Sequence, residues 1–308
     1  MKSISRRLDP IFNLPSKRIV SLFVIALLLG TINASAEEFS WRVKADDVFT
    51  IRLEQSMTAK SRVEPQERIE TSDATVNLTM TIVEVADAGI SAKMTVNDLA
   101  LKLGTPTKDG SGQIDLDTKS DKKLKDVAET LRQELLAVKG ATFEIVFLPN
   151  GKMISVTLDE ATEEKFRAAP ASSPLTNMFS KDGLQKMFSS THVVFPDGDI
   201  SPGHAWKTEP EATDEAGSGP PLNWSYSGIV TQNQRKLHRI ACSIPKSAQS
   251  SENGSKQVRI DGQYFYDSEL GFPVSGKVTS HVGIATQFRE LVIYTDIDTE
   301  STMTLTKN

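Results

Sequence analysis

Residues Lys256–Asp298, KQVRIDGQYFYDSELGFPVSGKVTSHVGIATQFRELVIYTDID, decide the fold class of this chain. Apolar and polar side chains alternate along three successive runs, with a turn at Glu269–Gly271 after the first run and the third run at Phe288–Ile297. The residues of one parity in the first two runs, nearly all apolar, are Val258, Ile260, Gly262, Tyr264, Tyr266, Phe272, Val274, Gly276, Val278, Ser280, Val282 and Ile284. Successive side chains of a strand point to opposite faces, so the alternation predicts three adjacent antiparallel strands with one apolar and one polar face.

The same alternation recurs through most of the chain. It is found at residues 39–54, where a bulge or turn is expected around Ala45–Asp47, and at 76–82, 90–96, 143–147, 154–158, 222–226 and 237–244. Between two of these runs stands Pro149-Asn150-Gly151, and Asn-Gly tolerates the positive φ angles of a tight hairpin turn. These patterns predict further antiparallel strands, one pair of them joined at Asn150-Gly151.

One segment has a helical period instead. Its apolar residues recur three and four positions apart, at Leu124, Val127, Ala128, Leu131, Leu135 and Val138. Ser120 or Asp121 is placed to cap the N-terminus, and Gly140 follows where a left-handed residue ends many helices. We expect an amphipathic helix at about 121–139, lying on the apolar face of the sheet.

Together these elements predict an α+β protein of mainly long antiparallel β-strands in one or two curved sheets. We divide the chain into a signal peptide at 1–36, a β-rich N-terminal half with the helix at 37–158, a helical and proline-containing linker at 159–191, and an antiparallel β half at 192–308. An internal duplication of the two halves stays open, because no residue-by-residue repeat is found.

The first 36 residues are typical of a secretory leader. Lys17-Arg18 precede the apolar run Ile19–Gly30, and Ala34-Ser35-Ala36 supplies the small residues of a cleavage site. The run is too short to cross a hydrocarbon core of ~30 Å as a helix. We therefore expect an exported protein, periplasmic or extracellular, with no stable membrane span after cleavage.

The charge balance disfavours nucleic-acid binding. The leader carries a net charge of +4 and the whole chain −5, which leaves about −9 for the remainder. An acidic chain without a basic stripe is a poor partner for nucleic acid or an anionic membrane. Cys242 is the single cysteine, so an intramolecular disulfide is impossible, and we expect this residue to be buried in a strand.

Catalytic and metal-binding patterns are missing from the sequence. The four histidines, His192, His204, His238 and His281, lack the spacing of a zinc site, and we place His238 and His281 at the surface. No glycine-rich phosphate loop or Gly-x-Ser-x-Gly motif occurs. The acid pairs Asp115/Asp117 and Asp296/Asp298 suit solvated strand edges better than a calcium site or a glycosidase pair. We expect no metal, no cofactor and no enzymatic activity.

Four stretches resemble an uncharacterised secreted bacterial family of the planctomycete type, known as a domain of unknown function. They are Trp41–Phe49, Val83–Gly89, Pro202–Trp206 and Tyr264–Gly271. The third departs from the family, which usually has an acidic residue before the tryptophan. More distantly, the expected curved sheet with a helix on its concave side is similar to the periplasmic lipoprotein carriers, which hold acyl chains. Neither resemblance implies catalytic residues.

The leading functional hypothesis is a non-enzymatic protein that binds an apolar ligand, lipid-like in kind, or an envelope protein on the concave face of its sheet. Large rings able to line such a face are Trp41, Trp206, Trp224, Tyr264, Tyr266 and Phe272, each of which could equally belong to the core. Two alternatives stay open: an assembly protein that pairs through a strand edge, and a hydrolase that uses two carboxylates.

Overall fold

The computed structural model describes residues 36–308 apart from 64–65, 106–112, 121–125, 169–173, 186–192, 209–220, 252–253 and 289–290. Glu37–Asn308 form one compact unit. The expected signal peptide and the first residues of the expected helix at 121–139 lie outside the described residues. Within the described ranges, no helix is long and apolar enough to cross a membrane.

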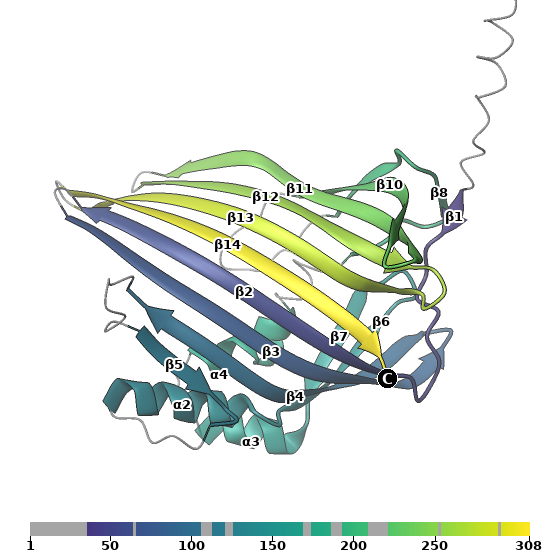
Figure 1. Cartoon of the computed structure of the whole chain (residues 1–308), viewed down its shortest axis with the longest axis horizontal. Helices are drawn as coiled ribbons and strands as arrows, with labels where there is room; N and C mark the ends of the chain where they lie inside the picture. Colours follow the sequence, from purple (N-terminus) through teal and green to yellow (C-terminus); the bar gives the residue numbers. More distant parts are fainter. Residues whose placement is uncertain are drawn as a thin grey trace, which may run out of the picture. The chain divides into compact units, whose positions relative to one another are not determined.

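A twelve-stranded antiparallel sheet dominates the unit and confirms the predicted fold class (Figure 1). Its long strands are β2 (Val48–Val63), β3 (Gln66–Ala86), β4 (Gly89–Gly104), β10 (Leu222–Gln232), β11 (Arg235–Ser251), β12 (Gly254–Asp267), β13 (Phe272–Phe288) and β14 (Leu291–Lys307). Its short strands are β5 (Gln113–Asp117), β6 (Thr142–Phe147), β7 (Met153–Leu158) and β9 (Ala205–Thr208). The order is β7-β6-β4-β3-β2-β14-β13-β12-β11-β10-β9, with β5 beside β4. A separate two-stranded sheet pairs β1 (Glu37–Glu38) with β8 (Asp199–Ile200).

The first long strand and the last strand of the chain are neighbours in the middle of the sheet. β2 and β14 pair without a register shift from Phe49 opposite Lys307 to Arg62 opposite Tyr294. The predicted three-strand meander is present as β12, β13 and β14, and the Asn150-Gly151 hairpin joins β6 to β7. Both predicted β-rich halves therefore contribute to one continuous sheet.

Among the described residues, the helices of the unit include α2 (Asp126–Val138), α3 (Glu160–Ala168) and α4 (Pro174–Met178). In the described part of the expected helix, Leu135 and Val138 are buried against the sheet, as the apolar stripe predicts. Gly140 has φ +76°, which confirms the left-handed residue expected after the helix. We call the face of the sheet that these helices contact the inner face, and the opposite one the outer face.

Two hydrophobic cores lie on the inner face. The first packs strands β2–β7 and the helices around residues such as Phe49, Met80 and Phe143. The second packs β10–β12 around Trp224, Tyr226 and Tyr266. Met303 of β14 contacts both cores, so the middle of the sheet joins them.

Residues 37–43, which we call the N-terminal strap, contribute side chains to both cores. Phe39 enters the second core, whereas Trp41 and Val43 enter the first. The sequence predicts a strand over 39–54 that is interrupted around Ala45–Asp47. The structure has a turn at 45–46, as predicted, but the large sheet begins only at Val48, so the predicted strand before the turn is wrong. The reason is that strap N–H groups bond to loops, Trp41 N to Pro149 O at 2.8 Å and Arg42 N to Gly271 O at 3.4 Å, while the side chains still alternate into the interior.

Gly276 is predicted to be indispensable for packing in the middle of β13. A Cβ atom there would lie 2.5 Å from Cδ1 of the buried Tyr264 ring. We expect Gly276→Ala to lower the free energy of unfolding by ~1–3 kcal/mol, the usual cost of overpacking. Urea unfolding followed by circular dichroism measures this change.

Gly283→Ala is the matched control on the same strand, because its nearest neighbour would be Asp296 Oδ1 at 3.4 Å. This variant should stay within ~0.5 kcal/mol of the wild type. Equal stabilities for the two variants would contradict the predicted contact between Gly276 and the Tyr264 ring.

Candidate ligand-binding face

The six rings predicted to line a binding face are divided between the two cores. Trp41 and Phe272 belong to the first core, with ring centroids 4.1 Å apart. Trp224, Tyr264 and Tyr266 belong to the second core. Only Trp206 among the six is half-buried, and its Nε1 donates to Val194 O at 2.8 Å. A role of these rings in binding stays a prediction, whereas their packing contribution is visible in the structure.

Beside the two cores, toward the hairpin ends, the inner face is only partly covered, and Val278 and Ile260 there still pack against the second core. We call this region the open floor and define it by three rows of residues that run across β2, β14, β13 and β12. The rows are Gln55-Ser301-Val278-Gly262, Met57-Thr299-Ser280-Ile260 and Ala59-Ile297-Val282-Val258. None of the twelve residues is buried; Gln55 is exposed and the other eleven are intermediate. The apolar face of the sheet therefore continues beyond the cores into accessible space.

Charged side chains of the same four strands point to the other side of the sheet. The outer positions include Glu54, Lys60, Arg259, Asp261, Lys277, His281, Asp296, Asp298 and Glu300. The open floor itself contains no ionisable side chain. Glu70 of β3 lies directly beside Ala59, at the edge of the third row, and pairs with Arg68 at 2.5 Å. Arg68 and Lys256 are of inner parity and lie one row nearer the hairpin ends. The floor is therefore accessible, mostly apolar and uncharged.

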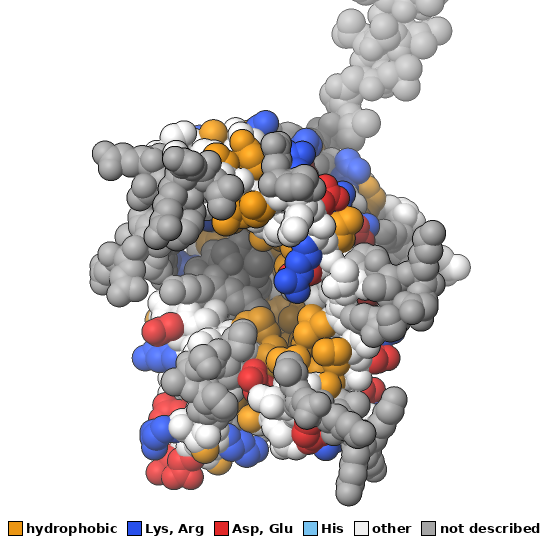
Figure 2. All heavy atoms as spheres, turned by 90° about the vertical axis from the view of Figure 1, so that its left-hand side faces the viewer, with side chains coloured by type: hydrophobic (Ala, Val, Ile, Leu, Met, Phe, Trp, Pro, Cys, Tyr) orange, Lys and Arg blue, Asp and Glu red, His pale blue; other side chains and the backbone are white. Residues whose placement is uncertain are grey.

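Figure 2 shows the molecule from the side of the hairpin ends of the long strands, where hydrophobic side chains border a hollow. The floor measures ~14 Å across its four strands and ~14 Å along them, from the spacings of β-structure. These dimensions match one acyl chain, since a bilayer core of ~30 Å holds two chains end to end.

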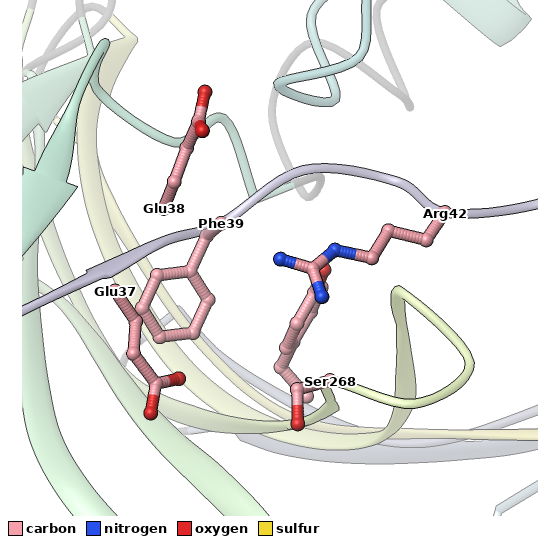
Figure 3. A pocket seen from close by; sticks show the side chains of 6 residues that line it. Glu37, Glu38, Phe39, Arg42 and Ser268 are labelled. Carbon is pink, nitrogen blue, oxygen red and sulfur yellow. The ribbon is translucent and has the colours of Figure 1, made fainter.

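A second, more polar cavity lies beside the N-terminal strap. It has a volume of about 340 Å³ and is lined by Glu37, Glu38, Phe39, Arg42, Tyr266 and Ser268 (Figure 3). Tyr266 Oη donates to Ser40 O at 2.5 Å and so ties the strap to β12. The mixed charges of this cavity suit water and small polar solutes better than an apolar ligand.

Next to this cavity, His238 is buried, and its predicted surface position is wrong. Its Nδ1 lies 2.8 Å from Tyr226 Oη and its Nε2 lies 3.2 Å from Glu37 Oε2. A carboxylate only accepts, so Nε2 carries a proton and Nδ1 of the neutral ring accepts from Tyr226. Burial lowers the pKa of His238, although Glu37 and Asp267 oppose this shift, and burial raises the pKa of Tyr226 to about 12. His238 shares its parity with Ile240 and Cys242, a signal that could have placed it inside.

We predict that His238 makes the protein less stable below neutral pH. The unfolded chain binds a proton at this residue near pH ~6.5, and the folded chain, with its lowered pKa, does so only at lower pH. The free energy of unfolding should therefore fall as the pH drops from 7 to 5, by at most ~1.4 kcal/mol per pH unit for one proton.

The variant His238→Gln should flatten this pH dependence, and the control His204→Gln, at an exposed position, should leave it unchanged. Urea titrations at several pH values measure both. Parallel pH profiles for the wild type and His238→Gln would contradict the assignment.

The two acid pairs that the sequence suggested as calcium or glycosidase sites are exposed to solvent, fully or partly. Asp296 and Asp298 flank the exposed His281 on the outer face, at 3.8 Å from its Nε2 and 2.8 Å from its Nδ1. Asp115 is exposed and Asp117 intermediate on the short strand β5. Over the described ranges, no group of three or more His, Cys, Asp or Glu residues could hold a metal ion.

Cys242 is buried as predicted, and its thiol should be inert. Burial, and to a lesser extent the charge of Asp261, raises its pKa to about 12. Because the thiolate is the reactive form, we expect no reaction of the folded protein with an aromatic disulfide reagent at pH 8 and stoichiometric reaction in urea. Labelling of the folded protein at the rate of a free thiol would show that β11 opens readily.

Comparisons with known proteins leave the family open. No family model and no curated protein matches the chain. A structure of lipovitellin, described by its lipid–protein interactions, is 8% identical with a TM-score of 0.45; the match covers 85% of this chain but only 25% of that one. An outer membrane channel from Pseudomonas putida F1 is 6% identical over 87% of this chain and 98% of that one, with a TM-score of 0.23. A protein of a family of unknown function from Desulfovibrio piger is 8% identical over 83% and 84%, with a TM-score of 0.12.

The present chain thus spans about a quarter of the lipovitellin chain that it matches. Likeness at these TM-scores establishes neither a shared family nor a shared function. The resemblances to the planctomycete-type family and to the lipoprotein carriers stay predictions.

Proposed function

We propose that this protein binds an apolar, acyl-chain-like ligand on the open floor of its sheet and catalyses no reaction. The composition and exposure of the open floor support the proposal best. Most of its twelve residues are apolar, none is charged, and none is buried. Monomeric proteins seldom leave a contiguous apolar patch accessible unless it serves binding. An exported carrier or envelope-associated binding protein fits this property.

The energetics of the floor favour a ligand with a hydrocarbon chain. Each methylene removed from water contributes ~0.8 kcal/mol, and the floor can cover several of them at once. The branched side chains on this surface lie at neighbouring positions of β14, β13 and β12; they are Ile297, Val282, Val258 and Ile260. The ligand would in turn shield these side chains, so binding should stabilise the fold.

A carboxylate substitution on the floor tests the proposal. Ile297→Asp places a charge among apolar neighbours. A ligand bound on the floor would remove water from this charge, which costs free energy and weakens binding. For the neutral dye N-phenyl-1-naphthylamine we expect saturable fluorescence enhancement with the wild-type protein and a dissociation constant at least tenfold higher for Ile297→Asp, which corresponds to ~1.4 kcal/mol.

Thr304→Asp is the matched control, since Thr304 lies on the same strand but is exposed on the outer face opposite Arg52. Its dissociation constant should stay within twofold of the wild type, and circular dichroism should show both variants folded. Failure of the wild type to bind the dye, or equal weakening by both substitutions, would overturn the proposed site.

A further inference from the structure

Four polar side chains interrupt the apolar surface of the open floor and form one contiguous group, the polar island. Gln55, Ser301, Thr299 and Ser280 occupy adjacent positions on β2, β14 and β13. Gln55 Nε2 donates to Ser301 Oγ at 3.3 Å. All four residues are of inner parity and at least partly accessible.

Apolar residues border the polar island on both sides along the strands. Leu53 and Met303 lie toward the first core, and Ala59, Ile297 and Val282 lie toward the hairpin ends. A polar group within an apolar surface lowers stability unless it finds a hydrogen-bond partner, and a ligand that covered the floor would remove water from these groups. A ligand of matching chemistry must therefore supply hydrogen bonds at this place and hydrocarbon beside it.

Charge decides which hydrogen-bonding group suits the island. Within the described residues of the floor there is no Lys, Arg or His that could neutralise an anionic head group, and no Asp or Glu that could neutralise a cationic one. Burial of an unpaired ionised carboxylate is far more costly than burial of a hydroxyl, ester or amide that keeps its hydrogen bonds. The amide of Gln55 and the three hydroxyl groups both donate and accept, as such neutral groups require.

We infer that the ligand is a neutral amphipathic lipid, with an uncharged hydroxyl-, ester- or amide-bearing head on the polar island and its acyl chain on the row Ala59-Ile297-Val282-Val258. This inference rests on the proposed function and narrows it to one class of ligand. It distinguishes neutral acyl esters and alcohols from free fatty acid anions, which share the same hydrocarbon chain.

Displacement of N-phenyl-1-naphthylamine by three twelve-carbon ligands at pH 8 tests the inference. Monolauroylglycerol should bind at least tenfold more tightly than the dodecanoate anion and also more tightly than dodecane, which offers no hydrogen bonds. In the double variant Gln55→Leu/Ser301→Ala, the advantage of monolauroylglycerol over dodecane, measured as the ratio of their dissociation constants, should shrink at least fivefold.

A double variant of similar kind on the outer face, Gln263→Leu/Thr304→Ala, serves as the control and should keep the full preference. Dodecanoate binding as tight as that of monolauroylglycerol, or an unchanged preference in Gln55→Leu/Ser301→Ala, would overturn the inference and leave dye binding and the proposed function intact. Absence of dye binding by the wild type would instead remove the proposed function, and this inference with it.

Discussion

The pairing of β2 with β14 is the constraint on which the rest of the structure depends. It joins strands more than 200 residues apart in sequence, in one unbroken register from Phe49 opposite Lys307 to Arg62 opposite Tyr294. Side chains alternate strictly along a strand, so a shift by one residue would turn every apolar side chain of one strand outward. The register thereby places the apolar faces of both chain halves on the same side and makes one surface of them.

The rings of the strap and the residues of the open floor determine which part of that surface is covered by side chains. Phe39 and Trp41 add large rings to the two cores at one end of the sheet, and Phe39 lies 5.0–5.2 Å from its aromatic neighbours, centroid to centroid. The open floor contains no aromatic residue, and most of its side chains are aliphatic, such as Ile297 and Val282, or small, such as Ser280. Filled cores at one end and an accessible floor beside them are the arrangement expected of a stable scaffold that carries a binding surface.

Much of the fold could be predicted from residue alternation. The meander of β12, β13 and β14 follows from its parity, the β6–β7 hairpin from Asn150-Gly151, and the end of α2 from Gly140. The strap could not be predicted, because alternation describes where side chains point and not whether the backbone has a neighbouring strand; its N–H groups bond to Pro149 and Gly271, far away in sequence.

The candidate site was harder to find from the sequence. Large rings suggest a binding surface, yet Trp41, Trp224 and Tyr266 are core residues, because rings bury the most area and are drawn inside. The signal that marks the open floor is weaker: twelve uncharged residues at neighbouring inward positions of strands whose outward positions are densely charged. Their exposure depends on what packs above them, which is a tertiary property. His238 was misplaced for a similar reason, since Glu37 and Phe39 of the strap cover it.

Native mass spectrometry of the protein, purified without detergent from its native host and followed by organic extraction, tests the central claim most directly. The account predicts a near-stoichiometric bound species that extracts as a neutral acyl lipid, and its loss in Ile297→Asp but not in Thr304→Asp. A bare protein mass, together with no uptake of added monolauroylglycerol, would contradict a binding role for the open floor.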